Sequence, residues 1–132
     1  MGELTVKQMH GSDLPEWCHA LPLRLESNGE PVCFLVGTGI PNNVLRWEDF
    51  KKYEKLFQPM GKKVEIHYHD HINAVCDVYN GRFYLVGDCG TTEEIDVTFA
   101  TCEDAHRNVL GVDFLTKFSA FGMGGNGFTF KF

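Results

Sequence analysis

The sequence predicts an all-β, barrel-like domain with two short helices. Most apolar residues occur in short runs in which they alternate with polar residues, which is the period of a strand with one buried face. Turns rich in glycine and asparagine separate these runs, as expected for strands that follow one another as hairpins. With 132 residues, 43% of them hydrophobic, the chain is long enough for one domain with a substantial core.

The first third of the chain predicts three strands. A short strand is expected over 4–6, followed by a loop. Alternating leucines predict a half-buried strand over 21–25, and Asn28-Gly29 favours a type I′ turn after it. Residues 31–36 are apolar and uncharged, so we expect a strand covered on both faces.

The middle of the chain predicts a helix and then a strand. From Trp47 to Phe57 the apolar residues recur at roughly helical spacing, and charged residues occupy the other faces, so we expect an amphipathic helix. Pro59 and Gly61 are expected to end it. A strand should follow over 64–68, because apolar and polar residues alternate there.

A second hairpin is predicted next, with strands over 72–79 and 82–86 joined by an Asn80-Gly81 turn. Alternation then predicts a strand over 94–102.

The last part of the chain predicts a short helix and a final strand. The segment 108–115 should enter a helix that ends near Phe118. A glycine-rich turn over 122–127 should precede a strand over 127–132, in which Phe128, Phe130 and Phe132 share one face. We divide the chain into an N-terminal strand and loop, 1–20, and a main domain, 21–132.

Composition argues against two classes of partner. The net charge is −6, and basic residues do not cluster beyond two lysine pairs, so we expect no direct contact with nucleic acid. No apolar run approaches the length of a membrane span, so we expect no membrane partner. The five cysteines are odd in number and lack Cys-x-x-Cys spacing, which favours reduced thiols in an intracellular protein, with cytoplasm and nucleus not distinguished.

Two segments carry a recognisable pattern. In the first, the apolar run 31–36 enters the tight turn Gly37-Thr38-Gly39. Buried strand followed by sharp loop is how many folds hold a catalytic group in a fixed position. The second segment reads Asn108-Val109-Leu110-Gly111-Val112-Asp113-Phe114-Leu115.

Together these segments resemble the retropepsins, the aspartic proteases of retroviruses and retrotransposons. Phe34-Leu35-Val36-Gly37-Thr38-Gly39 is similar to the family's active-site loop, with Gly37 where the family has its catalytic aspartate. The second segment is similar to the motif before the family's C-terminal helix, represented here by Val109, Leu110, Gly111 and Asp113. The predicted hairpin from Val75 to Gly87 is similar to the family's flap.

The resemblance implies an acid-protease fold and specific roles for several residues. The flap and groove would be formed by five consecutive residues, Val78, Tyr79, Asn80, Gly81 and Arg82. The resemblance also implies a homodimer, because each retropepsin subunit supplies one aspartate at the two-fold axis. Thr38 would link the two active-site loops, and the final strand, with Phe128, Phe130 and Phe132, would pair with its mate.

Gly37 implies that the chain has no protease activity. Two adjacent carboxylates share one proton, so that one activates a water and the other protonates the scissile carbonyl. A dimer of this chain lacks both carboxylates. Loss of general acid–base catalysis alone costs about 10²–10⁴ in rate.

Other constellations are weaker. Asp88-Cys89-Gly90-Thr91 has the look of a second active-site loop, but too few residues separate it from Leu110-Gly111, and a polar turn is the better interpretation. His67, His69 and His71 share a strand face that is polar, so we expect solvated histidines and neither a metal nor a cofactor. Cys18-His19 and the C-terminal glycines are interpreted as an ordinary cysteine and a flexible turn.

The sequence therefore predicts a catalytically inactive retropepsin-like domain, a pseudoprotease that forms homodimers and binds a peptide or protein. Two alternatives remain open. The first is an aspartic endopeptidase of retropepsin type in which an aspartate was replaced by Gly37 through engineering. The second is a small β-barrel adaptor whose similarity to proteases is incidental.

Overall fold

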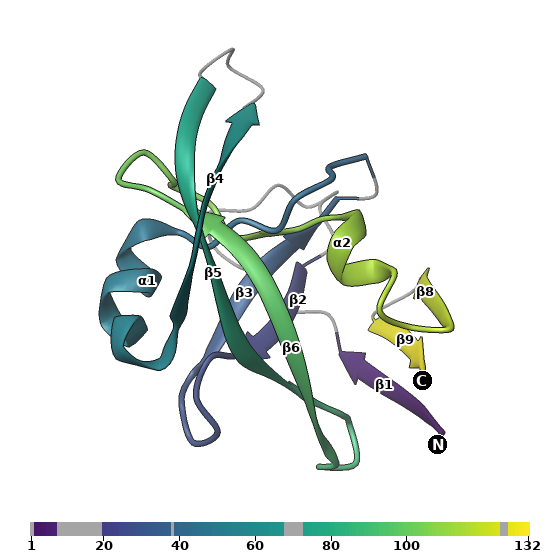
Figure 1. Cartoon of the computed structure of the whole chain (residues 1–132). Helices are drawn as coiled ribbons and strands as arrows, with labels where there is room; N and C mark the ends of the chain where they lie inside the picture. The colour runs from purple at the N-terminus through teal and green to yellow at the C-terminus, as the bar shows by residue number, and fades with distance from the viewer. Residues whose placement is uncertain (1, 8–19, 38, 68–72, 125–126) are drawn as a thin grey trace.

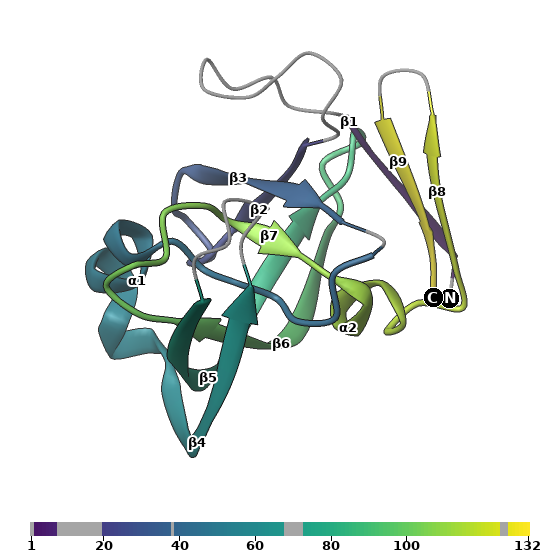
Figure 2. The same cartoon turned by 90° about the horizontal axis from the view of Figure 1, so that it is seen from above.

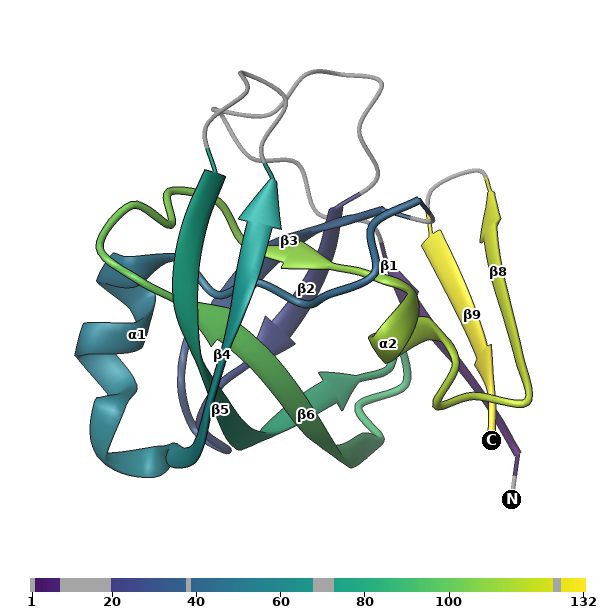
Figure 3. The ribbon, with the colours of Figure 1, turned by 45° about the horizontal axis from the view of Figure 1, so that its top comes forward.

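A computed structural model describes residues 2–7, 20–37, 39–67, 73–124 and 127–132 (Figure 1). Strands dominate these residues and form two antiparallel or mixed sheets, so the all-β prediction is confirmed. A helix, α1, lies at one end of the molecule, and the smaller sheet lies with a second helix, α2, at the other (Figures 1 and 3). None of the described helices is long and apolar enough to cross a membrane.

The larger sheet has six strands with the order β4-β5-β2-β3-β7, and β6 pairs with β5 outside this path. The strands are β2 (Ala20–Arg24), β3 (Pro31–Val36), β4 (Gln58–His67), β5 (Asn73–Val86), β6 (Thr92–Thr101) and β7 (Val109–Leu110). No closed barrel is assigned among the strands of the described residues. Instead, Val44 forms single β-bridges to Ala100 at the end of β6 and to Val109 in β7, and so joins these strands.

The smaller sheet contains β1 (Glu3–Lys7), β9 (Gly127–Lys131) and β8 (Ala120–Gly124), in that order. Leu4 lies opposite Phe130 in β9, and Val6 lies opposite Phe128. The two chain termini therefore lie side by side (Figure 2). The final strand is the centre of this sheet, with neighbours from its own chain on both sides. The glycine turn predicted over 122–127 is shorter than expected, since Gly122 and Gly124 belong to β8, and the two residues between Gly124 and Gly127 lie outside the described residues.

The predicted helix from Trp47 to Phe57 is confirmed as α1 (Trp47–Tyr53) followed by a single 3₁₀ turn, η1 (Glu54–Leu56). Phe50 and Tyr53 face the core from α1. Pro59 and Gly61 follow the helix but lie inside β4, where Gly61 has a φ of +73°. The second helix, α2 (Val112–Leu115), is shorter than predicted and buries Phe114.

The hairpin predicted around Asn80-Gly81 is wrong. β5 passes straight through these residues, pairing with β4 at Asn80 and with β6 at Gly81. A Cβ on Gly81 would lie 2.5 Å from the Phe57 ring, so the glycine makes room for close packing rather than for a turn. The actual hairpin joins β4 to β5, and its connection, 68–72, lies outside the described residues.

The turn between β2 and β3 is also longer than a type I′ turn. Six residues separate these strands, and the Gly29 amide donates to the Glu26 carbonyl at 2.9 Å. Gly29 is not among the glycines with positive φ, so the predicted turn type is wrong while the hairpin itself is confirmed. β3 is less covered than predicted, because only Phe34 in it is fully buried.

Two clusters form the core of the described residues. The main cluster is rich in aromatic rings, and its fully buried members include Phe34, Phe50, Phe83, Phe99, Phe114, Phe128 and Phe130. The smaller cluster lies beneath the β4–β5 hairpin and comprises Val44, Ile66, Ala74, Cys76, Ala100 and Ala105. Three of these six residues are alanines, and most of β4 is exposed.

Candidate functional site

The loop that follows β3 is held by β7. These strands pair in parallel, with Val36 next to Leu110. The Gly37 amide, one residue beyond β3, donates to the Leu110 carbonyl at 2.9 Å. The start of the loop is therefore fixed by main-chain hydrogen bonds that do not depend on the side chain at position 37. Thr38 lies outside the described residues, so its predicted role across a dimer axis stays a prediction.

Gly111 also supports this loop, because it packs closely against the loop backbone. A Cβ at Gly111 would overlap the carbonyl oxygens of Ile40 and Asn42, and these belong to the backbone of the returning loop. The next residue, Val112, donates its amide to the Ile40 carbonyl at 2.7 Å. Any side chain at position 111 would force the loop away from α2, so this part of the motif requires glycine for steric reasons.

Position 37 itself has room for a side chain. A Cβ on Gly37 would lie 2.7 Å from Cδ1 of Ile40, the far end of a flexible side chain that a change of rotamer can move. Gly37 does not have a positive φ, so its backbone conformation is open to any residue. The loop could therefore accept a side chain at position 37 if the side chain of Ile40 moved aside.

Asn43 connects the loop to its surroundings and was missed by the sequence analysis. Its side chain, 2% exposed, accepts a hydrogen bond from the Gly111 amide at 2.9 Å. Its Nδ2 donates to the Thr98 carbonyl at 2.9 Å and to Oδ2 of Asp113 at 3.3 Å. All strong donors and acceptors of this amide are used, as a buried polar group requires. The only signal in the sequence was an asparagine directly before a short apolar segment.

The second motif lies beside the loop that follows β3. Leu110 is fully buried, Val109 is half-buried in β7, and Asp113 is exposed at the start of α2, where it accepts the bond from Asn43. These residues lie next to the loop that follows β3 and serve as its support.

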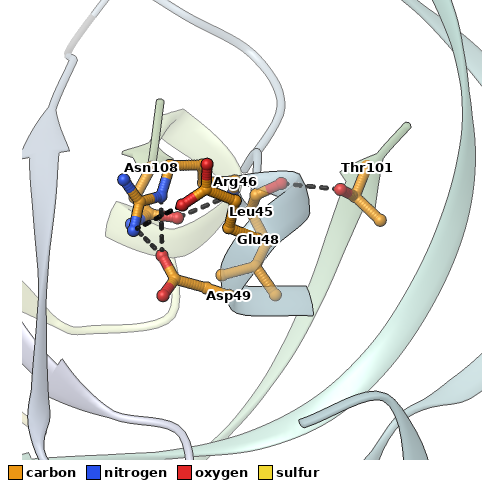
Figure 4. Close-up of polar contacts among 6 residues, drawn as sticks. All are labelled: Leu45, Arg46, Glu48, Asp49, Thr101 and Asn108. Carbon is orange, nitrogen blue, oxygen red and sulfur yellow. Dashed lines mark hydrogen bonds and ion pairs between the residues drawn. The ribbon is translucent and has the colours of Figure 1, made fainter. Parts of the chain in front are cut away.

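A second polar cluster fixes α1 to the start of β7 (Figure 4). Oδ1 of Asn108 accepts a hydrogen bond from the Arg46 amide at the N-terminus of α1, at 2.7 Å, and Nδ2 donates to Asp49 at 2.9 Å. The Arg46 side chain also donates to Asp49, at 3.2 Å. Nearby, the Thr101 hydroxyl donates to the Leu45 carbonyl at 2.7 Å. The side chain of Asn108 thus satisfies a helix amide that no residue of α1 caps.

The five residues predicted to form the flap lie in the middle of β5. Val78 is buried, and Tyr79 packs between the rings of Phe50 and Phe99, with centroid distances of 4.6 and 6.0 Å. Nδ2 of Asn80 donates to the Val97 carbonyl at 3.4 Å. Arg82 is exposed and makes ion pairs with two acidic side chains, those of Glu94 and Asp96. These residues are not at a hairpin tip, and contact with a peptide stays a prediction for them.

The three phenylalanines at the C-terminal end of the chain differ in burial. Phe128 and Phe130 are 1% and 0% exposed and belong to the main core, whereas Phe132 is 36% exposed. The first two are therefore used within the chain and are not available to a second subunit.

Two pockets lie away from Gly37 in the described residues. One, of about 280 Å³, is lined by residues that include Asn43, Thr98 and Asp113. The other, of about 410 Å³, lies between β1 and the turn after β5 and includes Asp88, Cys89 and Thr91.

The polar turn predicted over 88–91 is confirmed, with Gly90 at a φ of +87° and the Gly87 amide bonded to the Thr91 carbonyl at 2.8 Å. A hydrogen bond from Thr91 lowers the pKa of the exposed Cys89 thiol.

The histidine face is described only in part. His67 lies 2.6 Å from Oδ1 of Asn73 across the hairpin and 3.6 Å from Glu65, while His69, His71 and Cys18-His19 lie outside the described residues. Among the residues that the structure describes, no three histidine, cysteine or acidic side chains are grouped so that they could hold a metal ion.

Comparison with known proteins rests on structure alone. No family model matches the sequence, and no curated protein does. Among solved structures, the chain is similar to a retropepsin-like aspartic protease from Rickettsia conorii. The TM-score is 0.60 at 14% identity, over 98% of this chain and 90% of that one. The described chain therefore has a retropepsin-like aspartic protease fold, in which Gly37 directly follows strand β3.

Proposed function

We propose that this chain is a catalytically inactive retropepsin-like domain, a pseudoprotease that forms a homodimer and binds an extended peptide or protein segment. The observation that carries this proposal concerns the loop after β3: its backbone is held in place, but it lacks a catalytic side chain. The main-chain bond from Gly37 to Leu110 and the close approach of Gly111 to Ile40 keep the loop in place. The position that would need a carboxylate for general acid–base chemistry has no side chain.

The peptide would bind as an added strand along the outer edge of β4, in the β4–β5 hairpin. This mode uses main-chain hydrogen bonds, and so it needs no carboxylate. β4 is the last strand in its sheet order and is mostly exposed, which leaves main-chain groups on its outer side.

For the homodimer we propose the outer edge of β8. The final strand, β9, is paired on both sides and cannot serve. The sequence of β8 contains no charge and no proline, the features that usually prevent a strand edge from pairing with another chain. β1, the opposite edge, carries Glu3 and Lys7, and its Thr5 carbonyl already accepts the Asp88 amide at 2.8 Å. β8 is therefore the better edge for a second copy.

The alternative function, an aspartic endopeptidase inactivated by replacement of an aspartate, is favoured by one observation. The backbone at position 37 does not need glycine, and the nearest atoms to a Cβ there belong to the movable side chain of Ile40.

Peptide cleavage separates the two functions. A peptide library is incubated at mildly acidic pH with the wild type, Gly37→Asp and Gly37→Asn, and products are identified by mass spectrometry. Gly37→Asn is the matched control, because it adds nearly the same volume without a titratable group. Each variant is repeated with Ile40→Val, which relieves the contact at Cδ1. Dimer mass is measured for every protein by light scattering.

Each outcome is informative. Cleavage by Gly37→Asp alone would mean that the groove and dimer axis remain competent and would favour the alternative. No cleavage by a dimeric Gly37→Asp, together with peptide binding by the wild type, supports the pseudoprotease. Cleavage by the wild type would refute the proposal.

The dimer edge is tested with a charged residue on β8. Met123→Lys should convert the dimer to a monomer, whereas Thr5→Lys on the opposite edge should not, since both side chains are exposed. A wild type that is monomeric at every concentration would remove the homodimer from the proposal.

A further inference from the structure

The end of β6 and the first half of β5 bring two thiols into contact. The ladder between these strands ends at the pair Asp77 and Thr101, and the next residues in the same register are Cys76 and Cys102. Directly opposite residues of antiparallel strands have Cβ atoms about 4.5–5.5 Å apart, close to the separation that a disulfide spans. Their Sγ atoms are 2.9 Å apart, only about 0.9 Å longer than an S–S bond.

The two cysteines differ in burial and in hydrogen bonding. Cys76 is 0% exposed and belongs to the small cluster beneath the β4–β5 hairpin, while Cys102 is half-buried at its margin. The Cys76 thiol donates to the Cys102 sulfur. The outer sulfur is therefore the acceptor and the one that solvent can reach.

We propose that Cys76 and Cys102 form a redox-active pair that a low-molecular-weight disulfide, such as glutathione disulfide, converts to an intramolecular disulfide. This inference does not depend on the proposed function. Both residues are free thiols in the structure, as are Cys33 and Cys89.

Electrostatics assign the order of the two steps. Burial, the hydrogen bond to Cys102 and the charge of Cys102 raise the pKa of Cys76 to about 12, with smaller contributions from Asp104 and Asp77. Cys76 therefore stays protonated near neutral pH. Because the thiolate is the attacking species, Cys102 must react first and Cys76 second.

The reaction balances as follows. Cys102 loses its proton to solvent, and its thiolate attacks one sulfur of glutathione disulfide, which forms a mixed disulfide and releases one glutathione thiolate. The Cys76 sulfur then attacks Sγ of Cys102, the mixed disulfide bond breaks, and the proton of Cys76 passes to the departing glutathione thiolate, which leaves as the second glutathione. Two thiols of the protein are oxidised, and one glutathione disulfide is reduced to two glutathione molecules.

The disulfide would tie the base of the β4–β5 hairpin to the end of β6. The cluster under the hairpin consists of small side chains, with three alanines among its six buried members, so this end of β5 has modest apolar packing. A covalent link there should slow amide hydrogen exchange in β4 and in the first half of β5.

Peptide mapping tests the proposal in the Cys89→Ser background. Cys89 shares the tryptic peptide 83–107 with Cys102, whereas Cys76 is alone in peptide 64–82. Removing the exposed Cys89 thiol makes a cross-link between these two peptides unambiguous. The full chain is equilibrated in glutathione buffers from reducing to oxidising, thiols are blocked with iodoacetamide, and the digest is read by mass spectrometry. We expect the cross-link to appear on oxidation and to disappear with reductant.

Two variants check the order of attack. In Cys76→Ala, Cys102 should keep glutathione as a stable mixed disulfide, because the resolving thiol is gone. In Cys102→Ser, Cys76 should stay reduced and should be alkylated only after denaturation.

The parent protein gives a result whether or not these variants fold. If both thiols persist in oxidising buffer, or if peptide 83–107 is cross-linked to the peptide that contains Cys33 instead, the proposal is wrong. Glutathione on Cys76 of Cys102→Ser would also contradict it.

Discussion

At the scale of single residues, the candidate site is governed by two glycines with opposite requirements. Gly111 faces backbone oxygens that cannot yield, while Gly37 faces the end of an isoleucine side chain that can. The fold requires glycine at position 111 for steric reasons, but it does not require glycine at position 37. This contrast cannot be seen in the sequence, in which both positions read simply as glycine.

Gly111→Ala should destabilise the fold strongly. The added methyl group must displace the backbone of Ile40 or Asn42, and overpacking of this kind costs about 1–3 kcal/mol or more. Gly39→Ala is the matched control, because its Cβ would meet nothing within 4 Å and its φ is not positive. In urea, the free energy of unfolding of Gly39→Ala should lie within about 0.5 kcal/mol of the wild-type value. Equal losses in both variants would contradict the steric argument.

Asn43→Asp should be destabilising, and more so at neutral than at acidic pH. The new carboxylate would face the Thr98 carbonyl and Asp113, which now accept hydrogen bonds from Nδ2. Burial and the nearby acid disfavour the charged form, so the folded-state pKa of the new group lies above its unfolded value. The loss of stability is therefore largest above the folded-state pKa of the new carboxyl group. It decreases as the pH falls toward the unfolded-state pKa, because the protonated acid can then donate a hydrogen bond again. Urea midpoints from pH 7 to pH 4, compared with Asn43→Ala, would reveal this trend.

At the scale of elements, local patterns predicted most strands and α1. They wrongly placed a hairpin turn at Asn80-Gly81, inside the continuous strand β5. Alternation alone locates β1, β2 and β6, because each has one buried face. Asn80-Gly81 has the composition of a hairpin turn, but whether a glycine turns or lets a ring approach depends on Phe57, which is distant in sequence. The buried role of Asn43 likewise depends on Gly111 and Thr98, so no local rule could predict it.

Asn108→Ala should loosen α1. It removes the acceptor of the Arg46 amide and a donor to Asp49, in a helix that has no side-chain cap of its own. Loss of a cap costs about 0.5–2 kcal/mol. Glu48→Ala is the control, since the Glu48 side chain is 80% exposed and its contact with Arg46 is 3.8 Å long. Hydrogen exchange should accelerate in α1 for the first variant only; unchanged exchange in α1 would assign Asn108 no capping role.

At the scale of the whole molecule, aromatic rings attach the smaller sheet to α2 and to the segment that follows it. Phe130 contacts Phe114, Phe118 and Phe121, with ring centroids 4.7–6.4 Å apart. The sequence predicted an amphipathic final strand correctly, but it could not show that β1 would be its neighbour. That pairing joins residues at opposite ends of the chain.

Phe130→Ala should therefore destabilise the entire fold, by about 3–5 kcal/mol, because it leaves a cavity in the main core where the smaller sheet packs against α2. Phe132→Ala, at a side chain that is 36% exposed, should cost much less. Thermal unfolding of both variants measures the difference. A small loss for Phe130→Ala would mean that the smaller sheet contributes little to the stability of the domain.

The bridge at Val44 has a consequence for how the chain reaches this structure. Val44 pairs with Ala100 and Val109, partners that lie more than fifty residues further along the chain. Contacts between distant segments require large loops to close before any stabilisation is gained, which slows folding. On a ribosome, the loop after β3 would stay unsupported until β6 and β7 had been made. Folding kinetics should then show late ordering around Val44.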